Sequence, residues 1–483
     1  MTKGTIKKNY ILNVGNQLMN ILGTLATTPY LSRVLGADGI GAFSYAEAIA
    51  SYFVLVAILG TGTYAPREIS YVQDDKEKRS RVFFEVLLFR FITTALMLMI
   101  YIICMRNKVL LSIMSINILA VAFDVSWFFQ GIEAFEKIVT RNIVFKILYL
   151  LFVFLFIKSP GDLLKYTLGS AILNIAGNVS LWSYLPAYIT GQKITEIRAF
   201  RNLKVILSLL VPTIAIQIYT IFDKTMLGLF TETDFENGYY EQAMKIIRVV
   251  QVVVTALSAV MAPRIGYYFS KSRQDKVREY MLKAFRFVWL ISIPLAFGIM
   301  GISDNLVPWF MGTGYDKVII LLKILPILTV IIGISQITGI QYLIPTNRQN
   351  ILTKSVVIGA TVNFCINLIL IPKLYSVGAA IASVIAEIVI TGIQLWYVRK
   401  ELDVREAMIS GKNYLLAGIV MIIVLRLENL KFTVSVTHTM LMIFSGSLCY
   451  FGMLLIMKDE FFINNIWEIV DRVKRYRRDK TND

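Results

Sequence analysis

Long apolar windows, broken by short segments with charges or Gly and Pro clusters, run along the whole chain. In a helix that rises 1.5 Å per residue, about 20 apolar residues cross the hydrocarbon core of a bilayer. The windows predict fourteen such helices, over residues 10–31, 40–63, 82–105, 109–130, 142–157, 164–189, 203–229, 239–263, 281–303, 318–344, 351–371, 376–398, 412–427 and 437–457. We therefore predict an all-α polytopic membrane protein.

A sequence block near residue 65 recurs near residue 262. Ala65-Pro66-Arg67 returns as Ala262-Pro263-Arg264, and Phe89-Arg90-Phe91 returns as Phe285-Arg286-Phe287. The half of the chain that carries each copy includes six predicted spans. Because six is an even number, the two halves have the same orientation and are related by a pseudo-two-fold axis along the membrane normal. This predicts an N-lobe, a C-lobe, two extra C-terminal helices and a cytoplasmic tail, over residues 1–200, 201–400, 401–457 and 458–483.

Composition agrees with a membrane protein and argues against a nucleic-acid-binding one. Hydrophobic residues make up 56% of the chain and charged residues 17%, and the mean hydropathy is +0.65. The net charge is +17, but most of the 49 lysines and arginines fall in loops predicted to be cytoplasmic. This bias sets the orientation of membrane helices. It predicts a multi-pass protein with both termini in the cytoplasm.

The sequence shows no convincing signature of an enzyme or a metal site. Cys104, Cys365 and Cys449 fall inside predicted spans, and His438 is the single histidine, so neither a disulfide framework nor a metal site is expected. No phosphate-binding glycine-rich loop or nucleophile motif is found. The first span is too polar for a signal peptide and is expected to stay uncleaved. We expect neither an enzyme nor an ATP-driven pump, and no cofactor.

The tail from Lys458 onward alternates aromatic and aliphatic residues with arginines and lysines. This pattern predicts an interfacial amphipathic helix on an anionic leaflet. The alternative is a solvated basic tail.

Polar residues form stripes on the first helix of each predicted lobe. Such residues are costly in hydrocarbon unless they face water or another helix, so their helical phase is informative. The stripes are Asn13, Gln17, Asn20, Thr24 and Thr27 in span one, and Thr213, Gln217, Thr220 and Lys224 in span seven. Hydrogen bonds between helices are the alternative reading. The match between the two stripes favours a shared hydrated cavity.

Charged residues add a basic face to this predicted cavity. Glu241, Lys245 and Arg248 lie at i, i+4 and i+7 in span eight, and Glu47 lies in the corresponding span two. A local pair between Glu241 and Lys245 is the alternative, but it leaves Arg248 unexplained. We interpret the face as a cationic cavity wall that binds an anionic group.

Other charged residues in the spans suggest coupling and gating. Asp124 and Glu387 lie deep in predicted spans, and Asp223 lies near the outer end of span seven. Such acids are candidates for proton or sodium coupling, although helix-packing pairs are an equal alternative. The arginines of the repeated blocks, Arg67, Arg90, Arg264 and Arg286, are candidates for lobe contacts or gating. For Arg90 and Arg286 the alternative is snorkelling to the headgroups.

Three stretches resemble Wzx-type polysaccharide flippases. Trp127-Phe128-Phe129-Gln130-Gly131-Ile132-Glu133, followed by Thr140-Arg141-Asn142, is similar to their fourth-span signature. The other two stretches are Leu31-Ser32-Arg33-Val34-Leu35-Gly36 with Gly39 and Gly41, and Ala65-Pro66-Arg67-Glu68-Ile69. These flippases belong to the multidrug/oligosaccharidyl-lipid/polysaccharide (MOP) superfamily, and the fourteen-span plan covers nearly the whole chain.

The resemblance implies a function and a cargo. An undecaprenyl-pyrophosphate-linked oligosaccharide, for O-antigen, capsule or teichoic acid, would move to the outer leaflet by ion-coupled alternating access in a cationic cavity. Arg and Lys suit phosphate, which gives the predicted substrate-binding residues Lys224, Lys245, Arg248, Arg33, Glu47, Asn20, Thr24, Gln217 and Thr220. Related lipid II flippases carry arginines in the first span where this chain has Asn, Gln and Thr, which argues against a peptidoglycan precursor. Expected partners are the lipid-linked oligosaccharide, membrane lipids, a polysaccharide polymerase and chain-length machinery, with the chain itself monomeric.

Two competing functions stay open at this point. A cation-coupled multidrug exporter of the same superfamily should carry acids rather than a Lys and Arg face. An integral-membrane polymerase or glycosyltransferase usually has a sizeable outer loop, whereas the acidic loop at 231–237 is short.

Overall fold

The computed structural model describes residues 3–192, 197–430, 433–465 and 467, and every regular element in them is a helix. The side chains of residues 3–14, 208–216, 218–220 and 256–260 lie outside the description. The chain divides into two compact units, residues 1–241 and 242–483. Each unit is considered by itself, and the predicted lobe boundary at residue 200 stays a prediction.

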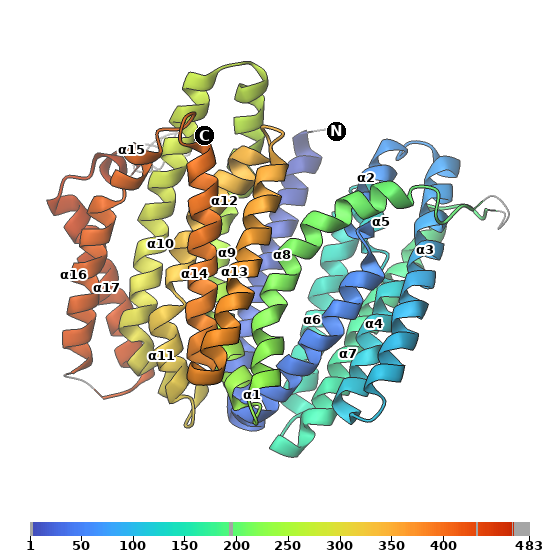
Figure 1. Cartoon of the computed structure of the whole chain (residues 1–483), viewed down its shortest axis with the longest axis horizontal. Helices are drawn as coiled ribbons and strands as arrows, with labels where there is room; N and C mark the ends of the chain where they lie inside the picture. Colours follow the sequence, from blue (N-terminus) through green and yellow to red (C-terminus); the bar gives the residue numbers. More distant parts are fainter. Residues whose placement is uncertain (1–2, 193–196, 431–432, 466, 468–483) are drawn as a thin grey trace, which may run out of the picture. The chain divides into compact units, whose positions relative to one another are not determined.

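The first unit is a helical bundle built around its longest helix (Figure 1). Its helices are α1 (Lys3–Ile58), α2 (Thr61–Tyr71), α3 (Lys76–Met105), α4 (Val109–Phe123), α5 (Ser126–Gly131), α6 (Phe135–Phe156), α7 (Leu163–Ser180), α8 (Leu203–Phe230) and the first residues of α9 (Phe235–Ser270), with short turns η1 (Pro160–Asp162) and η2 (Leu181–Ala187). Helix α1 packs on α3, α4, α6 and α8, and α4 packs on α7.

Two helix boundaries differ from the predicted spans for local reasons. Helix α1 covers the first two spans, with a corner at Gly36 whose φ of 70° and ψ of 174° are not helical. A positive φ favours glycine because it has no Cβ. The fourth span is broken between Asp124 and Val125, and this break separates α4 from α5. The Asp124 carboxylate accepts a hydrogen bond from the Ser126 amide at 3.0 Å, which stabilises the new helix start.

Gly41 and Gly238, which are 197 positions apart like Ala65 and Ala262 of the repeated block, allow two backbones to cross at close range. A Cβ at Gly41 would overlap the carbonyl oxygen of Asp234, and one at Gly238 would overlap that of Ala37. Each glycine therefore faces the backbone beside the other. Gly41 belongs to the resembling stretch of α1, so part of that motif is explained by packing.

A methyl group at either crossing glycine is expected to force the two backbones apart. For Gly41→Ala and Gly238→Ala we expect a loss of about 3 kcal/mol, the upper part of the range for overpacking. The measurement is thermal unfolding of the purified protein in detergent. Gly392→Ala is the matched control, because a Cβ there meets nothing within 4 Å. It should be neutral or slightly stabilising, and equal losses at all three sites would contradict the crossing.

The aromatic residues of the fourth-span motif form the core at one end of the first unit. Trp127, Phe128 and Phe129 are buried, and the Trp127 ring stacks on Phe83 with centroids 5.5 Å apart. A Cβ at Gly131 would meet the Ile69 side chain at 2.6 Å. The fourth-span motif thus packs against the helix that carries the Ala-Pro-Arg block.

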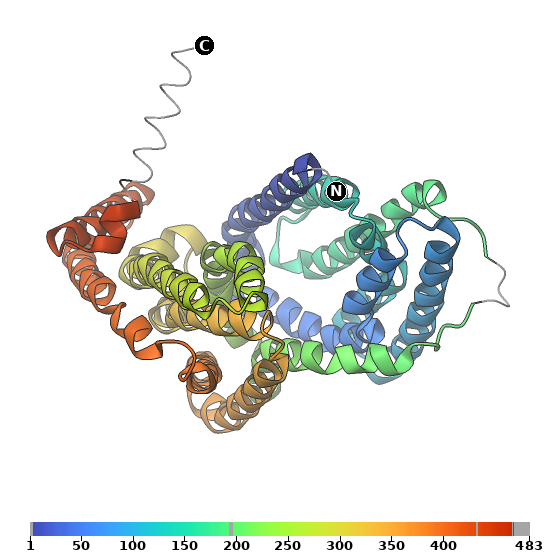
Figure 2. The ribbon, with the colours of Figure 1, turned by 90° about the horizontal axis from the view of Figure 1, so that it is seen from above.

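The second unit has its core around α10. Besides the rest of α9, it contains α10 (Gln274–Met311), α11 (Asp316–Ile324), α12 (Ile327–Gln336), the π-helical turn η4 (Ile337–Leu343), α13 (Gln349–Leu374), α14 (Ser376–Val398), α15 (Val404–Ile409), α16 (Lys412–Asn429) and α17 (Val436–Ile456). Helices α16 and α17 pack on each other and on α10, and α13 packs on α14 (Figures 1 and 2). The predicted tenth span is broken at Pro326, which lies between α11 and α12.

The prediction of a polytopic helical protein is confirmed. Ten segments within the described residues are long and apolar enough, by length and composition, to cross a membrane. The first, Gly15–Tyr71, contains the corner at Gly36 and includes two predicted spans. Helices α7, α8 and α9 lie where spans six to eight were predicted. The tail is helical over residues 460–465, and most of the predicted amphipathic helix lies outside the described residues.

Candidate functional site

Lys224 lies in a buried cluster of charges rather than on an open basic wall. Its Nζ atom is 2.8 Å from Glu241 Oε2 and 3.5 Å from Glu47 Oε2. The Lys224 side chain is 9% exposed, whereas that of Glu47 is 49% exposed. We call Lys224, Glu47 and Glu241 the Lys224 cluster. Its formal charge is −1, so this lysine already has two carboxylate partners.

The acid next to Lys224 is also engaged. Asp223 is buried, and its Oδ2 accepts a hydrogen bond of 2.6 Å from the Tyr240 hydroxyl. Asn237 donates to the backbone carbonyl of Lys224 at 2.9 Å. These bonds join α8 to the start of α9 within the first unit. Sequence reasoning placed Asp223 and Lys224 on one helix, but their partners come from other segments.

A polar cavity of about 390 Å³ opens between α1, α4, α6 and α7. We call it the amide cavity. Its polar lining residues are Glu47, Ser51, Asn117, Asp124, Ser126, Arg141, Asn174 and Asn178. Such a volume falls within the roughly 300–1,000 Å³ typical of small-molecule sites. Glu47 belongs to both the cavity wall and the Lys224 cluster.

Hydrogen bonds hold the amide groups of this cavity in place. Arg141 Nη1 donates to Asn178 Oδ1 at 2.8 Å, and Asn178 donates to the Ala120 carbonyl at 2.9 Å. Asn174 donates to Asn117 Oδ1 at 3.0 Å. The side chains therefore come from three helices, and their orientation is fixed before any ligand arrives.

Arg90 and Arg141, two cations near the cavity, differ in their partners. Arg90 donates from Nη1 to the Asp124 carbonyl at 3.0 Å and to Asp124 Oδ2 at 3.3 Å. Among the described residues, Arg141 has no carboxylate within ion-pair distance, and its buried Nε atom lacks a hydrogen-bond partner. An arginine inside a membrane bundle is costly unless it is paired or hydrated. Arg141 is therefore the cation of this wall that remains available to a ligand.

The predicted stripe of span one is partly satisfied within its own helix. Thr24, which is partly buried, donates to the carbonyl of the exposed Asn20 at 2.9 Å. Asn16, which is not part of the stripe, accepts an interhelical hydrogen bond from Asn142 of α6 at 3.2 Å. Arg33 is exposed on α1. In span seven Gln217 is exposed, and the side chain of Thr220 lies outside the described residues.

The second unit contains the remaining predicted site residues. Lys245 is half-buried and Arg248 exposed on α9, and Glu387 is buried on α14. Arg264 is exposed, whereas its counterpart Arg67 contacts Glu68 at 3.0 Å in the first unit. The proposed roles of all these residues in binding, coupling or gating stay predictions.

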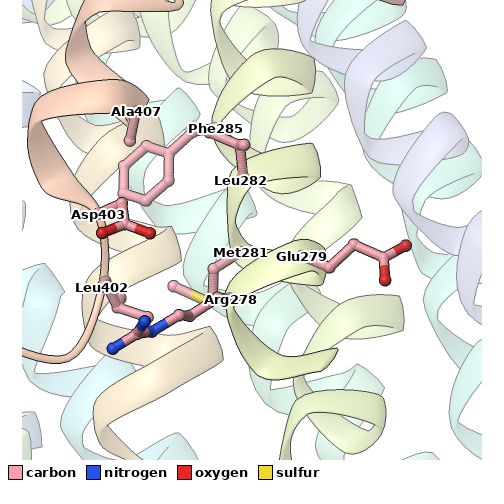
Figure 3. A pocket seen from close by; sticks show the side chains of 8 residues that line it. All are labelled: Arg278, Glu279, Met281, Leu282, Phe285, Leu402, Asp403 and Ala407. Atoms are coloured by element: carbon pink, nitrogen blue, oxygen red, sulfur yellow. The ribbon is translucent and has the colours of Figure 1, made fainter. Parts of the chain in front are cut away.

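The second unit also has two pockets of its own. One pocket, of about 120 Å³, is lined mainly by apolar groups that include Phe285 of the repeated block. Figure 3 shows that Glu279 points away from the other side chains that line this pocket. The other, of about 350 Å³, is lined by Arg286, Lys412, Lys458 and Asp459 among others. Arg286 lies 3.7 Å from Glu406, and Asp459 accepts hydrogen bonds from Tyr414 and Asn413.

Sequence reasoning missed most of the amide cavity. It selected Glu47 and Asp124 but not Arg141, although Thr140-Arg141-Asn142 was part of the family resemblance. Asn174 and Asn178 lie at i and i+4 on α7, so a phase analysis of spans four to six would have placed them on one face.

Comparisons with known proteins agree with this architecture. A family profile described as "Polysaccharide biosynthesis protein" matches residues 6–269. The "Putative O-antigen transporter" of Escherichia coli (strain K12) is 23% identical over 409 residues, which cover 82% of this chain and 97% of that protein. That relative is named as a transporter and not as an enzyme.

Solved structures share the fold. "Lipid II flippase MurJ, inward closed conformation" matches with a TM-score of 0.68 at 15% identity, over 95% of this chain and 99% of that one. An inward-facing multidrug resistance MATE family transporter of the MOP superfamily matches with a TM-score of 0.62 at 15% identity, over 81% of this chain and 95% of that one. The predicted fold class and the resemblance to Wzx-type polysaccharide flippases are confirmed. With a profile match over residues 6–269, more than half of its length, the chain belongs to the polysaccharide biosynthesis protein family.

Proposed function

We propose that this chain is a flippase that moves an undecaprenyl-pyrophosphate-linked oligosaccharide from the cytoplasmic to the outer leaflet for surface polysaccharide biosynthesis. The observation that carries this proposal is the amide cavity, a polar space of about 390 Å³ between helices with apolar outer faces. A sugar head group cannot cross hydrocarbon without replacing its hydration, and buried polar groups can supply that replacement. The polysaccharide biosynthesis family and the relative named as a putative O-antigen transporter support a lipid-linked oligosaccharide as the cargo.

In this proposal the pyrophosphate binds to the basic face of α9. Lys245 and Arg248 lie one turn apart on that helix, and charge-assisted hydrogen bonds to phosphate are stronger than neutral ones. Lys224 contributes less, because Glu241 and Glu47 already lie within ion-pair distance of it. Asn20, Thr24, Gln217 and Thr220 are proposed to line the path of the head group, with Arg33 at the membrane edge.

The proposed cycle is alternating access coupled to an ion gradient. Asp124, Asp223 and Glu387 are the proposed coupling acids, and the arginines of the repeated blocks are the proposed gate residues. We place both termini in the cytoplasm and the protein in the bacterial inner membrane, acting as a monomer beside a polysaccharide polymerase and chain-length machinery.

A multidrug exporter is the second candidate, because two carboxylates line the amide cavity and a MATE transporter shares the fold. Acids in such a site would attract cationic drugs. However, Asp124 is 3.3 Å from Arg90 and Glu47 is 3.5 Å from Lys224. Both acids thus have cationic partners, which favours a neutral or anionic head group.

Reconstitution tests the proposed function directly. Vesicles containing the purified protein and an undecaprenyl-pyrophosphoryl oligosaccharide should expose the sugar on both leaflets faster than protein-free vesicles, as measured by cleavage with a membrane-impermeant glycosidase. Unaccelerated exposure, together with active efflux of ethidium from the same vesicles, would support the drug exporter instead. Proton or sodium gradients imposed across these vesicles test coupling, with Asp124→Asn and Glu387→Gln as the variants expected to lose gradient dependence.

A further inference from the structure

The amide cavity offers both donors and acceptors of hydrogen bonds. Arg141 and the asparagine amides donate, while Glu47, Asp124 and the asparagine carbonyls accept. An ionised phosphate carries only acceptors and would lie beside two carboxylates, which costs free energy by like-charge repulsion. A sugar hydroxyl both donates and accepts. The mixed lining therefore suits a sugar ring better than a pyrophosphate.

The hydrogen-bonding capacity of the cavity is not exhausted by its own contacts. An arginine side chain has five N–H donors, and Arg141 donates one of them to Asn178. Asn174 uses one N–H on Asn117, which leaves its carbonyl oxygen for another donor. Because the same bonds fix the side-chain orientations, a ligand would meet groups that are already ordered, and this lowers the entropic cost of binding.

The position of the lining residues favours the head group over the lipid tail. The polar groups come from α1, α4, α6, α7 and the junction of α4 with α5, whereas α6 and α7 also carry exposed apolar residues such as Leu151, Leu155 and Ile172. A lipid chain gains nothing from amides and carboxylates, because burying them without hydrogen bonds is unfavourable.

We propose that the amide cavity binds one sugar residue of the lipid-linked head group, with Asn117 and Asn174 contacting its hydroxyls and Arg141 determining which sugar is accepted. This inference rests on the proposed flippase function and divides the cargo in two. The sugar belongs to the cavity of the first unit, and the pyrophosphate is assigned no place in that cavity.

The test compares the binding of two probes to the full-length protein in detergent by native mass spectrometry. One probe is undecaprenyl pyrophosphate, and the other is the lipid-linked repeat unit extracted from the source cells. The wild-type protein should bind the second probe more tightly. The dissociation constant of undecaprenyl pyrophosphate divided by that of the lipid-linked repeat unit reports the contribution of the sugar alone.

Asn117→Leu with Asn174→Leu removes both members of a hydrogen-bonded pair, so neither amide is left without its partner. In this variant the ratio of the two dissociation constants should fall at least about tenfold, as expected for the loss of two neutral hydrogen bonds of roughly 1 kcal/mol each. Its affinity for undecaprenyl pyrophosphate should not change. Arg141→Gln should lower the same ratio. The matched control is Asn16→Leu with Asn142→Leu, an interhelical asparagine pair of the same unit that does not line the cavity, and it should keep the wild-type ratio.

The outcomes separate the two proposals. If the Asn117 and Asn174 variant keeps the wild-type ratio, or if the wild-type protein binds both probes equally, the sugar subsite is wrong while the flippase function stands. If the wild-type protein binds neither probe, the proposed function itself fails. A lower ratio in the cavity variants with unchanged pyrophosphate binding supports the subsite.

Discussion

A Lys245→Ala/Arg248→Ala variant is expected to lose export of surface polysaccharide while the protein stays at its normal level in the membrane. Each hydrogen bond to a charged group contributes about 1.5–3 kcal/mol. Removing two of them should weaken pyrophosphate binding by roughly 10²–10⁴-fold. Export would be measured by staining of the cell surface, and the lipid-linked precursor should accumulate on the cytoplasmic side.

The matched control removes two other positive charges from the same unit. Lys276 and Lys283 pair with Glu279 on an exposed face of α10, and surface pairs of this kind contribute about 0–1 kcal/mol. Lys276→Ala/Lys283→Ala should export normally. Lys245→Arg/Arg248→Lys, which retains both charges, should keep most of the activity. Normal export by the double alanine variant would rule out the basic face of α9 as the phosphate site.

Arg90→Met is expected to destabilise the first unit strongly. The Arg90 side chain is 2% exposed, its Nε donates to Thr61 Oγ1 at 2.8 Å, and its guanidinium lies 5.7 Å from the centre of the Trp127 ring. Removing one partner of a buried ion pair costs roughly 3–5 kcal/mol. Because the Asp124 side chain is 29% exposed, we expect the lower end, about 3 kcal/mol, in thermal unfolding of the purified protein.

The repeat supplies the control for this variant. Arg286 is the counterpart of Arg90, but it is 36% exposed and lies 3.7 Å from a Glu406 side chain that is 56% exposed. Arg286→Met should therefore cost less than about 1 kcal/mol. Arg90→Met/Asp124→Asn should be less destabilised than Arg90→Met, since the unpaired carboxylate is removed. Equal losses for the two single arginine variants would contradict the role assigned to burial.

The fold class could be predicted because membrane helices depend on local properties. About 20 apolar residues are enough to indicate a span, and the helices of the structure lie close to the predicted windows. The interruptions at Gly36 and Pro326 are also local, since the first needs a positive φ and the second disrupts helical hydrogen bonding. The break before Val125 was not predicted, because the apolar run continues across it.

The repeated blocks were a guide to architecture more than to chemistry. Ala65 and Phe89 are buried in the core of the first unit, and Phe285 is buried in that of the second. Their arginines have diverged in environment, since Arg90 is enclosed by its partners while Arg286 is half-exposed. A repeat in the sequence shows that two segments are related, but the neighbours of each copy decide what its charged residues do.

By itself, the sequence determined the helical spans, the duplication and the basic face of α9, because hydropathy and helical phase are set by residues close together in the chain. Only the tertiary structure decided which charges are neutralised and which line a cavity. Lys224 is paired with Glu47, 177 positions away, and Arg141 bonds to Asn178 on another helix. Such partners depend on the rotation and depth of one helix against another. That packing is a property of the whole bundle, and no local window of sequence contains it.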